Sequence, residues 1–330
     1  MRLIAAELLR ARSRRATWII LSGLVGLCLF FLGGNFVSTS MPSDQELAEQ
    51  RVYFERDLAD WKLNHQQYYD SCVSDAAANE QSPVDWGCEG YLEEPTFENY
   101  TWSPDGFAER VTRETTGLLI LAAALMFLLG ASLTAAEHAT GSLGNWLTFE
   151  PRRSRVFFSK LAAPAVVAVC AAALVTALGV LGTAAWTELR GIPSPEPLDT
   201  GKLVGAILRT SGVVVAAAVL GAALGSLLRH TAAVIGVVAG YFVVVEMVFR
   251  GMFWESALHG WFVSTRLLAI TEGKTSYFVN VCAWNQDELY RECTQVEKFI
   301  TAADATLYLG SIGLVLVVVS WLAFRRRDVH

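Results

Sequence analysis

Long uncharged blocks of apolar residues dominate the pattern of hydrophobic and polar positions along this chain. A run of about 18 or more apolar residues is long enough, as a helix, to cross a hydrocarbon core about 30 Å thick. The blocks predict spans at residues 17–38, 116–136, 159–186, 203–228, 232–249 and 305–324. Six such blocks favour an all-α polytopic membrane protein over a soluble protein that buries its apolar helices.

The segments between the spans complete the predicted domain organisation. Residues 1–16 place leucines near one face of a helix and arginines on the other, which is typical of a helix lying in the membrane interface. The first span is longer than the core of a cleaved signal peptide, so we expect it to be retained. The other segments are an outer domain at 39–115, an inner loop at 137–158, an outer loop at 187–202, a re-entrant outer region at 250–304 and an inner tail at 325–330.

Positive charge predicts the orientation. With six spans, the arginine-rich segments all fall on one side, and the positive-inside rule makes that side cytoplasmic. These basic residues are Arg2, Arg10, Arg12, Arg14, Arg15, Arg152, Arg153, Arg155, Lys160, Arg229, Arg325, Arg326 and Arg327. On the opposite side, residues 39–114 hold 17 acidic and 5 basic residues, a net charge of −12. The net charge of −6 therefore averages two unlike faces.

Four of the six cysteines fall in the predicted outer segments, two in each. An oxidising exterior favours disulfides, so the local pairs Cys72–Cys88 and Cys282–Cys293 are predicted. Free thiols are the alternative, and a metal site is less favoured because no C-x-x-C motif or histidine cluster accompanies them. The other two cysteines lie inside spans and are expected to be small packing residues.

The outer domain begins with a long amphipathic helix. Ser43 and Glu46 have the spacing of a capping box, and apolar residues then recur at intervals of three, four or seven. These positions are Leu47, Phe54, Leu58, Trp61, Tyr68 and Cys72. The acidic stretch that follows holds the aromatic residues Trp86, Tyr91, Phe97, Tyr100 and Trp102. Their rings could form a ligand platform, but the core of a small disulfide-tied domain is the commoner use and is expected here.

The region 250–304 starts with the apolar string GMFWESALHGWF. It predicts one or two short helices that dip back toward the membrane, followed by a disulfide-tied loop. Irregular backbone at membrane depth persists only where protein or water shields it. We therefore expect this region to cap a cavity or a subunit interface.

Two charged residues, Arg209 and Glu246, lie inside predicted spans. A charge within the membrane is costly and marks a functional site by default. Both lie near the outer ends of their spans, however, where Arg209 can snorkel to the interface and Glu246 can pair with Arg250. We therefore expect structural roles for both. The third and fourth spans are rich in alanine and glycine, including Gly221 and Gly225, and this composition predicts close helix packing.

The sequence shows no motif of a catalytic site. The string EGKT at 272–275 ends like a phosphate-binding loop, but that loop needs a glycine where Leu268 stands, and the predicted topology puts the string outside the cell. The motifs H-E-x-x-H, G-x-S-x-G and C-x-x-C are absent from the sequence. We expect a protein that is not itself an enzyme and that has no nucleic-acid partner.

The inner loop at 137–158 is too polar to lie in lipid and too aromatic for an idle linker. Its candidate contact residues are Glu137, Gly141, Leu143, Trp146, Leu147, Pro151, Arg152 and Arg155. Leu147 lies one helical turn beyond Leu143, and Trp146 offers an anchor of the kind that dominates interfaces. The loop thus has the character of a contact surface. The alternative is a plain amphipathic hairpin whose arginines lie at the lipid headgroups.

This loop resembles the signature of the type-two ATP-binding-cassette exporter permeases. In that family a glutamate is followed by G-[TS]-L, a further leucine, a proline with arginine, and a lysine at the next span. The matching residues are Glu137, Gly141, Ser142, Leu143, Leu147, Pro151, the arginines that follow it, and Lys160. The spacing from Glu137 to Pro151, with two arginines directly after it, is similar to that of permeases common in high-GC Gram-positive bacteria. The interfacial first helix, the six spans, the two ends inside and the dipping outer segment also resemble the family. The outer domain is much longer than in the simplest family members.

The resemblance implies a transmembrane subunit that lies in a bacterial plasma membrane and works by alternating access. Two copies, or one copy and a relative, would form a dimer in the bilayer, and a homodimer is expected. Two separate ATPase subunits would bind ATP and magnesium and press on the loop as a coupling helix, while this chain carries no cofactor. The exported substrate is expected to be amphipathic: a drug, a peptide or a lipid-like molecule.

Two other functions are compatible with the sequence. A membrane sensor or immunity protein would bind a peptide or cation through the acidic outer domain and would have no ATPase partner. A proton-coupled secondary transporter would depend on Glu246, so Glu246→Gln would abolish its transport. Such transporters also tend to show repeat symmetry between halves, which this sequence lacks.

Overall fold

The computed structural model describes residues 2–39, 41–79, 81–84, 86–101, 104–139, 152–194, 197–285 and 290–326. Six helices in this part of the chain are long and apolar enough to cross a membrane, which makes this a multi-pass membrane protein. They are α2 (Arg15–Ser38), α4 (Phe107–Ala139), α6 (Arg153–Leu189), α7 (Thr200–Leu228), α8 (Thr231–Tyr241) with its continuations η3 (Phe242–Phe249) and α9 (Arg250–Met252), and α11 (Ala302–Arg326). Each overlaps one predicted span, so the predicted number of helices able to cross a membrane is confirmed.

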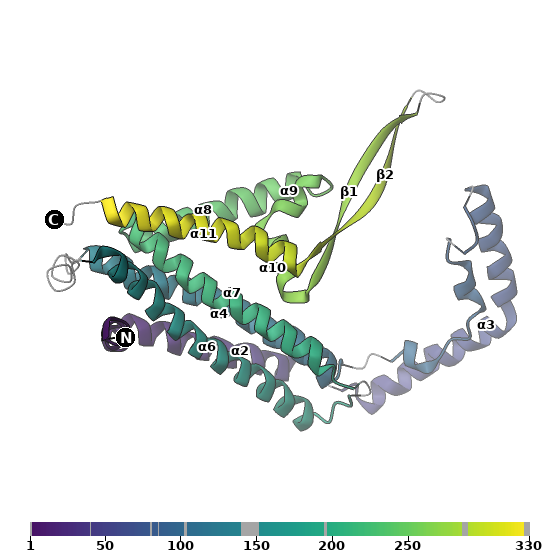
Figure 1. The fold of residues 1–330 in the computed structure, drawn as a ribbon. Helices are drawn as coiled ribbons and strands as arrows, with labels where there is room; N and C mark the ends of the chain where they lie inside the picture. Colours follow the sequence, from purple (N-terminus) through teal and green to yellow (C-terminus); the bar gives the residue numbers. More distant parts are fainter. Residues whose placement is uncertain are drawn as a thin grey trace.

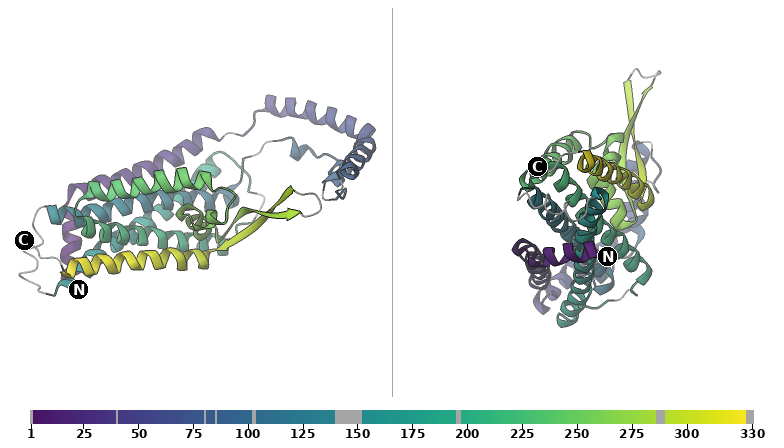
Figure 2. Two further views of the ribbon diagram at one scale, coloured as in Figure 1. Left: turned by 90° about the horizontal axis from the view of Figure 1, so that it is seen from above. Right: turned by 60° about the vertical axis from the view of Figure 1, so that its left-hand side comes forward.

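The long helices form one bundle, and both chain ends lie at the same end of it (Figure 1). The short helix α1 (Arg2–Ser13) is at that end, which we call the base. The long helix α3 (Asp44–Ala78) and the strands β1 (Lys274–Asn285) and β2 (Tyr290–Thr301) project from the opposite end, as Figure 2 also shows. That the base faces the cytoplasm stays a prediction of the arginine pattern.

Helices α4 and α7 form the centre of the bundle. Small residues let their backbones approach closely: a Cβ at Gly221 would overlap the carbonyl oxygen of Phe127, and a Cβ at Gly130 would overlap that of Ala218. The Thr134 hydroxyl on α4 donates to the Ala222 carbonyl on α7 at 2.9 Å. The surrounding core includes Leu24, Leu119, Met126, Val175 and Val214, all fully buried. The close packing predicted around Gly221 is therefore confirmed.

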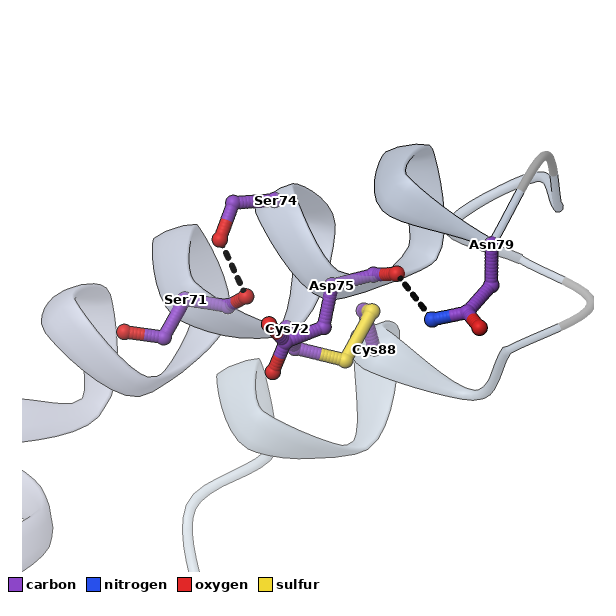
Figure 3. The surroundings of a disulfide bond; sticks show 6 residues. All are labelled: Ser71, Cys72, Ser74, Asp75, Asn79 and Cys88. Atoms are coloured by element: carbon purple, nitrogen blue, oxygen red, sulfur yellow. Dashed lines mark hydrogen bonds between the residues drawn. A yellow bond between two sulfur atoms is a disulfide. The ribbon is translucent and has the colours of Figure 1, made fainter.

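The outer domain is an arm built on α3. Its predicted capping box is present, because the Glu46 amide donates to the Ser43 hydroxyl at 3.3 Å and the Ser43 amide donates to the Glu46 carboxylate at 2.7 Å. The chain then returns along α3 through the 3-10 helices η1 (Cys88–Leu92) and η2 (Phe97–Asn99). The predicted disulfide between Cys72 and Cys88 joins the returning segment to α3 (Figure 3).

Most of the aromatic residues on the returning segment pack against α3. The Phe54 ring lies 5.5 Å from the rings of both Phe97 and Tyr100. The Trp61 indole donates to the Tyr91 carbonyl at 2.9 Å. Core packing, the expected use of these residues, is thus confirmed for Phe97 and Tyr100, which are partly buried, whereas Tyr91 is 47% exposed. Trp86 is 41% exposed, and Trp102 lies outside the described residues.

The double variant Cys72→Ser/Cys88→Ser should loosen the arm without unfolding the bundle. The bond closes a loop between residues 16 apart, and a crosslink of that length stabilises by about 3 kcal/mol. Hydrogen exchange of the full chain in detergent should rise across residues 81–101 and stay unchanged in α4 and α7. Cys170→Ser is the matched control, because that cysteine is free and exposed. Unchanged exchange at 81–101 would contradict the expectation.

The region after α9 differs in part from the prediction. Two short helices are present as expected, η4 (Ala257–Trp261) and α10 (Val263–Glu272). The disulfide-tied loop, however, is an antiparallel hairpin of β1 and β2, and Cys282 and Cys293 form its cross-strand disulfide. The all-α prediction is therefore wrong here. The physical reason is the run of aromatic and β-branched residues Tyr277, Phe278, Val279 and Val281, a composition typical of strands.

Candidate functional site at the base of the bundle

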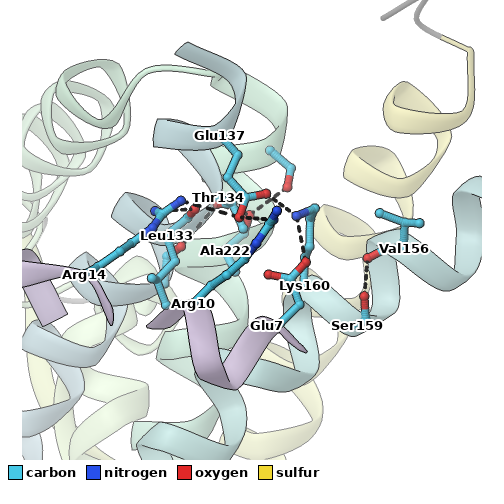
Figure 4. Close-up of polar contacts among 12 residues, drawn as sticks. Glu7, Arg10, Arg14, Leu133, Thr134, Glu137, Val156, Ser159, Lys160 and Ala222 are labelled. Carbon is cyan, nitrogen blue, oxygen red and sulfur yellow. Dashed lines mark hydrogen bonds and ion pairs between the residues drawn. The ribbon is translucent and has the colours of Figure 1, made fainter. Parts of the chain in front are cut away.

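A buried lysine at the base joins three helices. The Lys160 ammonium, on α6, donates to the Glu7 carboxylate of α1 at 2.9 Å and to the Glu137 carboxylate of α4 (Figure 4). The side chains of Lys160, Glu7 and Glu137 are 3%, 7% and 5% exposed. Burial of charge is tolerated only when partners compensate it, so these three groups depend on one another.

Two arginines complete this cluster, which we call the base cluster. The Arg14 guanidinium lies 3.5 Å from the Glu137 carboxylate and donates to the Leu133 carbonyl at 3.0 Å. The Arg10 guanidinium lies 3.7 Å from the same carboxylate. The base cluster thus holds three cations against two carboxylates. The arginines are partly exposed, so their contacts with Glu137 are weaker than that of the buried lysine.

Helical spacing explains how α1 contributes to the cluster. Glu7 and Arg10 are three residues apart, which places both side chains on one face of α1. That face lies against the bundle, since Glu7 and Ala11 are buried. The space left between these side chains is a cavity of only about 10 Å³. The base cluster is therefore a tightly packed contact between helices, and the space between its side chains is too small for a ligand.

The base cluster connects the two ends of the inner loop. Glu137 lies near the end of α4 and Lys160 lies near the start of α6, so their ion pair closes the loop between these helices. The predicted loop residues Gly141, Ser142, Leu143, Trp146, Leu147 and Pro151 lie outside the described residues. Arg152 and Arg155 are described and exposed at the start of α6. The structure therefore brings together Glu137 and Lys160, the first and last residues of the predicted motif.

Three members of the base cluster, contributed by α1 and the residue after it, are absent from the predicted site. The pattern of residues 1–16 predicts an interfacial helix and gives no separate role to Glu7, Arg10 or Arg14. One signal for them exists in the sequence: Glu7 is the single acidic residue among the first 15, in an otherwise basic segment. An acid in that setting favours a specific cationic partner.

The two intramembrane charges have partners different from those expected. The Glu246 carboxylate accepts hydrogen bonds from the Val263 amide at 2.8 Å and from the Ser264 hydroxyl at 2.5 Å, instead of an ion pair with Arg250. The Arg209 guanidinium donates to the Ile270 carbonyl at 2.8 Å instead of snorkelling to the interface. Both expected contacts are thus corrected, because α10 lies close enough to bind both charges.

Comparisons with protein-family models, curated proteins and solved structures give no match to this chain. The resemblance of the inner loop to the exporter permeases therefore rests on the residues of the loop itself.

Proposed function

We propose that this chain is the transmembrane subunit of an ATP-binding-cassette exporter, which acts as a dimer with two separate ATPase subunits. The observation that carries the proposal is the buried bridge from Lys160 to Glu137 and Glu7. Glu137 and Lys160 are the two ends of the motif through which this chain resembles the exporter permeases. An ion pair between them gives the loop a fixed base on which an ATPase could act.

The same contacts offer a route for movement into the bundle. A force on the loop would reach α4 through Glu137, α6 through Lys160 and α1 through Glu7, because the base cluster joins all three. Helix α4 in turn packs tightly against α7, so its displacement would shift the centre of the bundle. Rigid helices joined in this way can switch together between two arrangements, which is what alternating access requires.

The division of residues between the two ends of the bundle also fits a subunit that draws its energy from another protein. The arm and the hairpin lie at the end opposite the base, and the loops that join α4 to α6 and α7 to α8 are short. The phosphate-binding motif is absent from the sequence, so ATP and magnesium would be bound by the partner ATPase. Under this proposal the base faces the cytoplasm of a bacterial cell, and the exported substrate is amphipathic.

The proposal predicts that loop variants lose the ATPase. Glu137→Ala with Leu147→Asp removes the buried carboxylate and puts a charge at the expected contact surface. Loss of an interface anchor worth about 2 kcal/mol lowers affinity about 30-fold. Purification of the full chain from its host in mild detergent should recover a stoichiometric ATPase with the unmodified protein and little with the variant. ATP-driven transport in vesicles should fall in parallel.

Leu189→Asp is the matched control, since Leu189 ends α6 at its other end and is 78% exposed. This variant should keep both the ATPase and transport. Unchanged transport in the Glu137→Ala/Leu147→Asp variant would overturn the proposal. A preparation that holds no ATPase and binds a peptide or cation would instead support the sensor, whose ligand would contact the acidic arm.

A further inference from the structure

Helix α10 is capped at both ends by charged side chains from two other helices. At its start, the Glu246 carboxylate accepts from the amides of Val263 at 2.8 Å and Ser264 at 3.3 Å. At its end, the Arg209 guanidinium donates to the carbonyls of Ile270 at 2.8 Å and Thr271 at 3.4 Å. These are the amide and carbonyl groups that a helix leaves without partners inside itself.

Each charge has the sign that its end of α10 favours. A carboxylate complements the partial positive charge at a helix N-terminus, and a guanidinium complements the negative C-terminus. Glu246 is 8% exposed, so its charge-assisted hydrogen bonds are little screened by water. An isolated helix of 10 residues is marginal in stability, so α10 depends on contacts with the rest of the chain, which are these caps and the packing of Ala269 and Ile270 against Ile300 and Ala305.

The two caps come from different spans, and α10 therefore bridges them. Arg209 belongs to α7, whereas Glu246 belongs to η3, the continuation of α8. Directly after α10, Gly273 adopts a φ of 94°, and its carbonyl accepts from the Ala302 amide at 2.8 Å. This bond ties the end of α10 to the start of α11, beside the residues where strand β1 begins and strand β2 ends. Movement of α10 would therefore carry the hairpin with it.

The segment that carries Glu246 has an unusual backbone. Phe242–Phe249 forms a π-helix, with hydrogen bonds one residue longer than those of an α-helix. Such segments are rare and frequently lie at functional sites. A return of this segment to α-helical bonding would turn Glu246 about the helix axis and away from the start of α10. The π-helix thus supplies a second arrangement in which the cap contact is broken.

We infer that α10 and the hairpin form one structural unit, which we call the latch, at the end of the bundle opposite the base. The contacts of Glu246 and Arg209 with the two ends of α10 together keep this unit packed against the bundle. Loss of either contact releases the whole unit, and the π-helix sets whether Glu246 is in place. The inference goes beyond the proposed exporter function and does not rest on it, since it follows from contacts among α7, η3, α10 and α11 within this chain.

Hydrogen exchange of the full chain in nanodiscs tests the latch. Glu246→Ala and Arg209→Met should each raise exchange of the amides at 263–272 by at least tenfold along the whole helix. The double variant should exchange no faster than the faster single variant, because one release event already frees both ends. Glu246→Gln keeps an acceptor oxygen without the charge and should show a smaller rise. If Glu246→Ala does not fold, Glu246→Gln with Arg209→Met supplies the same comparison.

Asp304→Asn is the matched control. The Asp304 carboxylate accepts from the Thr301 hydroxyl at 2.7 Å and caps α11, so this variant should leave exchange of 263–272 unchanged. The inference is overturned if Glu246→Ala affects only residues 263–264, Arg209→Met affects only 268–272, and the two effects add. That pattern would mean two independent local caps on a fixed helix.

Discussion

Lys160→Met is expected to lower the free energy of unfolding by about 3–5 kcal/mol, the range for breaking a buried ion pair by removing one partner. The methionine fills a similar volume but leaves the Glu7 and Glu137 carboxylates, 7% and 5% exposed, without the ammonium between them. Unlike a surface ion pair, this arrangement lets little water compensate for the lost charge. Denaturation in detergent, followed by helical signal, measures the loss.

Removing the two buried carboxylates as well should recover much of that stability. In the triple variant Glu7→Gln/Glu137→Gln/Lys160→Met, no buried carboxylate remains to be compensated, so we expect it to be more stable than Lys160→Met alone. Lys202→Met is the matched control, because Lys202 is 84% exposed and lies 3.4 Å from Asp199. Its effect should stay within about 0.5 kcal/mol. Equal effects of Lys160→Met and Lys202→Met would show that the base cluster does not hold the helices.

The triple variant also distinguishes the contribution of the base cluster to stability from its contribution to transmitting force from the inner loop. If the base cluster transmits force from the loop, the triple variant should fold well yet transport poorly, because neutral side chains no longer tie the loop ends to α1. A stable triple variant with full transport would leave the cluster as a stabilising contact alone.

The spans and disulfides could be predicted from local features of the sequence. An apolar block of sufficient length has few alternatives to crossing the membrane, and two nearby cysteines in an outer segment need no knowledge of distant contacts. Helix α3 of the arm could be predicted for the same reason, since the capping box of Ser43 and Glu46 and the spacing of the apolar residues are local signals. The hairpin was not predicted although its aromatic and β-branched residues are visible, because a close pair of cysteines suits an irregular loop equally well.

The partners of the charges could not be predicted, because they depend on tertiary placement. Glu246 is four residues from Arg250 in the sequence, which makes a local pair the natural expectation. One actual partner is local, since the Tyr241 hydroxyl donates to it at 3.0 Å. The other two, Val263 and Ser264, are 17 and 18 residues away and reach it only because the chain folds back after α9. Lys160 and Glu7 are likewise 153 residues apart. In each case the sequence identifies a charge that needs a partner without identifying the partner.

Gly221→Leu is expected to force apart the two central helices of the bundle. Even a Cβ at this position would overlap the Phe127 carbonyl oxygen and approach the Ala131 amide at 3.1 Å. Both are backbone groups within α4, so they cannot yield as a flexible side chain does. Overpacking commonly costs about 1–3 kcal/mol, and a rigid contact of this kind belongs at or above the upper limit.

The consequence should be separation of α4 from α7, with loss of the Thr134–Ala222 hydrogen bond that now joins them. Size-exclusion chromatography of the detergent-solubilised Gly221→Leu variant should show aggregate in place of a single symmetric peak. The aggregated fraction of Gly221→Ala should lie between those of the unmodified chain and Gly221→Leu. Gly212→Leu is the matched control on the same helix, since a Cβ there meets no atom within 4 Å. It should behave like the unmodified chain. If Gly212→Leu and Gly221→Leu were equally tolerated, the α4–α7 contact would not be what holds the bundle together, and a push on α4 from the base would have no tight partner to move.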